Sequence, residues 1–118
     1  MRGPKLFVDA IHLVTLTAAN FKAEVLEASL PYLVSFWAGW CAPCKIMDPL
    51  IGEIASEYDR RAHFGRVNID DEEALAMEYG IRAVPTLLIF MNGEVVDKMI
   101  GAHPRHDVTA SLEKHLLC

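Results

Sequence analysis

The 118-residue sequence has no long apolar segment, no cluster of basic residues and only three cysteines. Its longest apolar runs, near Leu33 and Leu88, have the length of a strand and fall short of the roughly 20 residues that cross a bilayer. Lys and Arg number 11 against 16 acidic residues, and no run of them could follow a phosphate backbone. We therefore expect a soluble protein that binds neither nucleic acid nor a membrane.

The cysteines are too few and too unevenly spaced for a disulfide framework. Cys41 and Cys44 form one close pair, and Cys118 ends the chain. The apolar stretch behind the basic start is interrupted by Asp9 and His12 and lacks the small-residue cleavage site of a secretory signal. These features predict a cytoplasmic protein in a reducing compartment.

The length and the 53% apolar content allow one hydrophobic core. We expect a single domain over residues 1–118, with residues 1–10 as an N-terminal extension. Apolar periodicity and turn residues predict five strands and four helices. In chain order these are a strand at 11–15, a helix from 18 to about 29 capped by Thr17, a strand at 32–37, a helix from about 43 to 60, a strand at 63–69, a short helix to 79, strands at 86–91 and 94–100, and a last helix from Pro104 to the terminus.

Several local patterns indicate how these strands and helices are arranged. The almost continuous apolar run at 32–37 is typical of a central strand covered on both faces. Asp70 and Glu73 resemble a capping box for the short helix, which Gly80 should end. Asn92-Gly93 is suited to a tight hairpin turn, so the two strands beside it should be antiparallel. The order β-α-β-α-β-α-β-β-α predicts an α/β fold, a mixed sheet with helices on both faces.

The segment Cys41-Ala42-Pro43-Cys44 lies where a buried strand is expected to end and a helix to begin. Free backbone N–H groups and the positive end of the helix dipole would favour a thiolate at the first sulfur. A thiolate attacks disulfides, and a second thiol three residues on can resolve the mixed disulfide. We expect Cys41 to be the exposed nucleophile, Cys44 to be the shielded resolving thiol, and Pro43 to stiffen the turn between them.

Two other interpretations of the pair are half of a zinc site and two buried core thiols. A zinc site needs two more ligands. Among the five histidines only His103 and His106 are closely spaced, and there is no second cysteine pair. We therefore expect no bound metal.

The segment 36–45, Phe-Trp-Ala-Gly-Trp-Cys-Ala-Pro-Cys-Lys, resembles the active-site segment of the thioredoxin family. The resemblance extends over about residues 11–117. Further matches follow in the same order at Pro49, 67–70, 79–82, 84–87, 92–94 and 101–102.

This resemblance implies a five-stranded thioredoxin fold and an enzyme that reduces protein disulfides without a bound cofactor. It further implies a role in electron transport and cell redox homeostasis, a monomer, and re-reduction by an NADPH-dependent thioredoxin reductase. By position, Cys41 is the nucleophile and Cys44 the resolving thiol. The residues that would border the substrate groove are Trp40, Ala42, Pro43, Val84, Pro85, Gly101 and Ala102, with the Val84-Pro85 peptide cis as in the family.

The sequence departs from the family pattern near the cysteines. Ser35 stands where many thioredoxins carry a buried aspartate thought to exchange a proton with the resolving thiol, so Cys44 would lose its proton to water or to another group. Arg66, where lysine is frequent, either keeps a positive charge facing this region or is an ordinary solvated side chain. Trp37 is interpreted as a core aromatic. The alternative function is a non-catalytic binding or scaffold module on the same fold.

Overall fold

The computed structural model describes residues 13–116, and no helix among them is long and apolar enough to cross a membrane. The extension at 1–10, the first two residues of the predicted strand at 11–15, and Cys118 lie outside the described residues. In chain order the elements are β1 (Val14–Thr15), η1 (Lys22–Leu26), β2 (Tyr32–Trp37), α2 (Ala42–Glu57), β3 (His63–Asn68), α3 (Glu73–Glu78), β4 (Thr86–Met91), β5 (Glu94–Ile100) and α4 (Arg105–Glu113).

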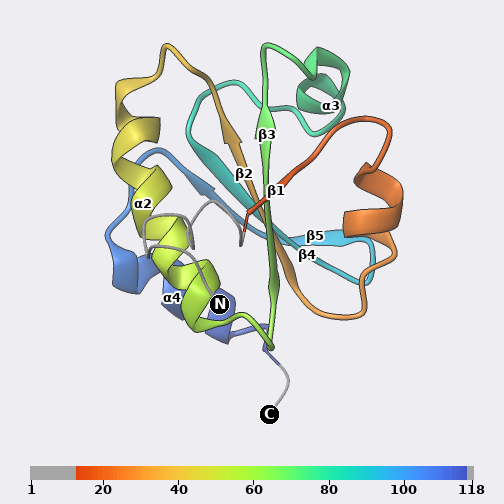
Figure 1. Ribbon diagram of the computed structural model, residues 1–118, viewed down its shortest axis with the longest axis vertical. Helices are drawn as coiled ribbons and strands as arrows, with labels where there is room; N and C mark the ends of the chain where they lie inside the picture. The colour runs from red at the N-terminus through yellow and green to blue at the C-terminus, as the bar shows by residue number, and fades with distance from the viewer. Residues whose placement is uncertain (1–12, 117–118) are drawn as a thin grey trace, which may run out of the picture.

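The five strands form one mixed sheet in the order β1-β3-β2-β4-β5 (Figure 1). Strands β1 and β2 run parallel to β3, whereas β4 is antiparallel to both β2 and β5. Strand β2 lies in the middle, as its apolar run predicts. The α/β prediction, with helices on both faces of a mixed sheet, is confirmed.

Alternation along the central strands divides the core into two layers. Leu33 of β2 and Ile89 of β4 are register partners that pack with apolar residues of α2 and α4 on one face of the sheet. Val34 and Leu88 are the next pair, and they pack with residues of η1 and α3 on the opposite face. Figure 1 shows α2 and α4 together on one side of the sheet and α3 on the other. The helix that carries the two cysteines is thus anchored on the central strand that precedes it.

Turn chemistry confirms the predicted hairpin between β4 and β5. Asn92 and Gly93 have φ angles of 54° and 83°, which is the left-handed region that Asn and Gly tolerate. Gly80 ends α3 with φ 64°, as predicted, and the Ile81 N–H donates to the Ala76 carbonyl at 2.9 Å.

The first helix is shorter than predicted. The predicted cap at Thr17 is wrong, because the cap residue of the helix is Phe21, which makes no side-chain hydrogen bond to it. Thr17 instead closes the turn before the helix: the Asn20 N–H donates to Thr17 Oγ1 at 3.3 Å and the Thr17 N–H donates to Asn20 Oδ1 at 2.8 Å. The regular stretch is however only the π-helical turn Lys22–Leu26, in which the Glu27 N–H reaches back five residues to Lys22. The predicted helix over 18–29 was therefore too long.

The predicted capping box at Asp70 and Glu73 is wrong. Helix α3 begins at Glu73, and its cap residue Glu72 makes no side-chain hydrogen bond to the helix. The Glu72 carboxylate instead accepts from the Ala18 N–H at 2.9 Å. It therefore binds a distant segment of the chain rather than the N–H groups of its own helix. The last helix also ends earlier than predicted, at Glu113, and Pro104 is its cap residue.

Candidate active site

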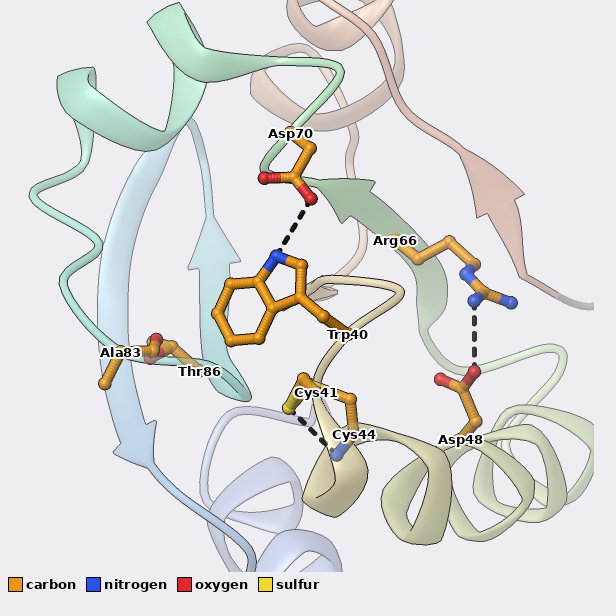
Figure 2. The surroundings of a disulfide bond; sticks show 8 residues. All are labelled: Trp40, Cys41, Cys44, Asp48, Arg66, Asp70, Ala83 and Thr86. Carbon is orange, nitrogen blue, oxygen red and sulfur yellow. Dashed lines mark hydrogen bonds and ion pairs between the residues drawn. A yellow bond between two sulfur atoms is a disulfide. The ribbon is translucent and has the colours of Figure 1, made fainter.

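Cys41 is the cap residue of α2, at the junction with the loop that follows β2. Its φ and ψ of −92° and 109° are extended, and its Sγ accepts the Cys44 N–H at 3.1 Å (Figure 2). Pro43 lies in the first turn, where a missing N–H costs no helical hydrogen bond. The sulfur therefore lies at the positive end of the helix dipole, as the sequence predicts.

Cys41 and Cys44 are joined by a disulfide, with their Cα atoms 5.3 Å apart. A spacing of three residues on a helix N-terminus brings the two sulfurs into bonding distance without moving the backbone. No group of three or more His, Cys, Asp or Glu residues within 13–116 could hold a metal ion. The arrangement is that of a dithiol/disulfide couple.

The expectation that Cys41 is exposed is wrong for this disulfide form. Cys41 exposes 4% of its surface and Cys44 only 1%. The reason is packing: both cysteines form a cluster with Ala38, against which Val84 and Ile69 also pack. Cys41 remains the more accessible of the two cysteines.

The predicted groove residues differ in how the structure places them. Val84 packs against the cysteine cluster, and the Val84-Pro85 peptide is cis. The Thr86 hydroxyl donates to the Ala83 carbonyl at 2.7 Å across this turn, and the Gly101 N–H donates to the Pro85 carbonyl at 2.8 Å. These contacts tie Gly101 to the loop beside the sulfurs.

The remaining groove candidates are exposed. Trp40, Ala42 and Pro43 are exposed neighbours of the cysteines in the chain, and 69% of Trp40 is accessible. Ala102 is also exposed and follows Gly101 in the chain. An apolar, accessible rim of this kind is suited to another protein rather than to a small polar molecule.

Asp70 is a site residue that the sequence analysis missed, having interpreted it as a helix cap. Its Oδ2 accepts the indole Nε1–H of Trp40 at 3.0 Å (Figure 2). The two residues are thirty positions apart, and no local spacing indicates the pair. The hydrogen bond orients the exposed indole beside Cys41.

Arg66 is not an ordinary solvated side chain. Its Nη2 donates to Asp48 Oδ2 at 3.0 Å, and its guanidinium carbon lies 4.3 Å from the centroid of the Trp37 ring. Trp37 is only partly buried, and it packs against the cysteine cluster. Ser35 is buried in β2 and is the register partner of Arg66 in β3. Asp48 is a second residue in this region that the sequence analysis missed.

A separate polar network lies between β5 and α4. The Asp97 carboxylate accepts from Ser111 Oγ at 2.7 Å and contacts Lys114 Nζ at 3.0 Å and His115 Nε2 at 3.2 Å. Burial raises the pKa of Asp97, but these donors outweigh it and bring the pKa down to about 2. His103, before the start of α4, lies 3.0 Å from the Ile100 carbonyl and 3.6 Å from the Asp107 carboxylate. These groups belong to the helix entry and the sheet edge rather than to the disulfide.

Comparison with known proteins agrees with this geometry. Residues 12–114 match the family model described as Thioredoxin. Thioredoxin 1 of Synechococcus elongatus and the thioredoxin of Pyropia yezoensis are each 47% identical to the chain over 100 residues, which cover 85% of the chain and 94% of each relative. Thioredoxin 1 of Nostoc sp. is 45% identical over the same shares.

Proposed function

Because the chain belongs to the thioredoxin family and is a thiol-disulfide oxidoreductase, we propose that Cys41 attacks protein disulfides and that Cys44 resolves the product. The observation that carries this assignment is the hydrogen bond from the Cys44 N–H to Cys41 Sγ. A backbone donor and the helix dipole stabilise a thiolate at Cys41 and not at Cys44, which lies one turn into the helix.

The reaction follows from these two roles. The Cys41 thiolate attacks one sulfur of the substrate disulfide, that bond breaks, and the leaving substrate sulfur takes up a proton. Cys44 then loses its proton and attacks Cys41 Sγ, which forms the disulfide seen here and releases the second substrate thiol. The substrate gains two electrons and two protons per cycle, and a reductant must then return both cysteines to thiols.

The rim around the sulfurs would hold the substrate chain. Trp40, Ala42 and Pro43 would lie on one side of it, and Val84, Pro85, Gly101 and Ala102 on the other. The exposure of the first three and the hydrogen bond that ties Gly101 to Pro85 support this assignment. The cysteine chemistry would then take place between two apolar surfaces.

The physiological setting is proposed on the same basis. The chain would act as a monomer in the cytoplasm, would carry electrons to disulfide-containing proteins, and would be re-reduced by an NADPH-dependent thioredoxin reductase. A single close cysteine pair, rather than a disulfide framework, supports a reducing compartment.

Insulin reduction, driven by NADPH and a thioredoxin reductase, tests the proposal. We expect turnover with the wild-type protein, none with Cys41→Ser, and a trapped mixed disulfide with Cys44→Ser. Cys118→Ser is the matched control and should reduce insulin normally. Turnover by Cys41→Ser would exclude the assigned roles. A wild-type protein without turnover, in which Cys41→Ser changes nothing, would indicate a binding module.

A further inference from the structure

A carboxylate of the same helix lies one turn beyond the resolving cysteine. Asp48 follows Cys44 by four residues on α2, and side chains at this spacing are neighbours on a helix surface, with Cβ atoms about 5–6 Å apart. The carboxylate is bound by Arg66 of β3, and the side chains of Asp48 and Arg66 are 32% and 24% exposed. Figure 2 shows the pair beside the same helix as the disulfide.

The cation of this pair is linked to the cysteines by packing. The Arg66 guanidinium lies over the Trp37 ring, and Trp37 packs against the cluster that contains Cys41 and Cys44. Ser35, the register partner of Arg66, is buried and has no charge to contribute. A partly buried carboxylate one helical turn from Cys44, and a partly buried guanidinium over the Trp37 ring, therefore belong to the surroundings of a thiol that has to ionise during each cycle.

The other charged groups around the cysteines are more exposed or are bound elsewhere. Lys45 on α2, Asp71 after β3 and Arg82 before β4 are exposed, so solvent screens them. Asp70 is exposed and holds the Trp40 indole, and His103 contacts Asp107 and the Ile100 carbonyl. Asp48 and Arg66 are thus the charges best placed to act on Cys44.

We propose that Asp48 and Arg66 are positioning residues whose opposed charges set how readily the Cys44 thiol releases its proton in the resolving step. This inference rests on the proposed role of Cys44. The Arg66 charge favours the Cys44 thiolate, and the Asp48 charge both opposes it and holds the guanidinium against Trp37. The proton goes to solvent, Cys44 Sγ bonds to Cys41 Sγ, and the bond from Cys41 to the substrate breaks.

An NMR titration of the Cys44 β-carbon in the reduced, full-length protein tests the inference. Asp48→Asn keeps the shape and a hydrogen-bond acceptor but removes the negative charge, so the Cys44 pKa should fall by about 1 unit. Arg66→Gln should raise that pKa by a similar amount, and the double variant should titrate between the two. The mixed disulfide with substrate should also resolve several-fold faster in Asp48→Asn at neutral pH.

Glu53→Gln is the matched control. Glu53 is also a carboxylate of α2 that pairs with an arginine of another element, Arg105 of α4. It lies nine residues from Cys44, about 13 Å along the helix axis and beyond the screening length of physiological salt. The Cys44 pKa should not change in this variant.

Identical Cys44 titrations in Asp48→Asn and the wild type would overturn the inference, as would an equal shift in Glu53→Gln. Thermal unfolding of the oxidised variants checks that each one is folded. Full insulin reduction by Cys44→Ser would instead remove the proposed role of Cys44, and the titration of the Asp48 variant would not depend on that result.

Discussion

The N-terminus of α2 and the network around Asp97 both bring polar or reactive groups together, but they differ in how many hydrogen-bond partners those groups have. Cys41 Sγ accepts one backbone N–H and is otherwise surrounded by apolar side chains. The Asp97 carboxylate is contacted by three side chains and by the Lys98 N–H. A fully bonded group is held in one ionic state and stabilises the fold, whereas the sulfur keeps the freedom to exchange its partner.

The largest expected effect is that of Cys41→Ser, which should abolish activity but leave the stability of the fold nearly unchanged. Cys41→Ser should lower the rate of insulin reduction by more than about 10³-fold, because the attacking thiolate is lost. The free energy of unfolding of the reduced protein should change by less than about 1 kcal/mol, since serine keeps a side-chain acceptor at the cap position. Denaturant unfolding beside the activity assay checks both values. A large loss of unfolding free energy would show that the N-terminus of α2, like the Asp97 network, stabilises the fold.

The converse variant is Asp97→Ala. It removes the acceptor of three side chains and leaves the buried Ser111 hydroxyl without its partner, so the free energy of unfolding should fall by about 2–3 kcal/mol. Insulin reduction at a temperature where the variant is folded should be unchanged. A loss of activity in the folded protein would contradict this separation.

Acid should weaken the Asp97 network over a defined pH range. The folded Asp97 pKa of about 2 lies below its ordinary value of 3.8, so the ionised carboxylate stabilises the fold above about pH 4 and this contribution is lost as the pH falls towards 2. The difference in unfolding free energy between the wild type and Asp97→Asn should therefore shrink by about 2 kcal/mol from pH 7 to pH 2. A constant difference would show that the carboxylate is not held in its ionised form.

The smallest expected effect concerns the rim of the sulfur site. Trp40→Phe removes the donor to Asp70 while keeping an exposed aromatic ring, so kcat/KM for insulin should fall about 2- to 5-fold. Asp70→Asn, which retains an acceptor oxygen, should have a smaller effect. Unfolding measurements should show little change in either variant, because both residues are exposed.

Much of the fold could be predicted from the sequence because its signals are local. The limits of β2, β4 and β5 agree with the prediction to the residue, since apolar runs and the Asn92-Gly93 turn depend on neighbours in the chain. The cysteine pair at a helix start could be predicted for the same reason. The cap of α3 could not, because Glu72 binds the Ala18 N–H from a distant segment.

The sequence by itself determined the order of strands and helices, the position of the two cysteines at the start of α2, and the residue types available around them. Only the tertiary structure decided that Cys41 is buried in the disulfide form, that Asp70 holds Trp40, and that Asp48 holds Arg66 beside Trp37. The physical reason is that local propensity depends on residues a few positions apart. A long side chain takes its partner from whichever strand or loop the packed sheet brings within hydrogen-bond distance.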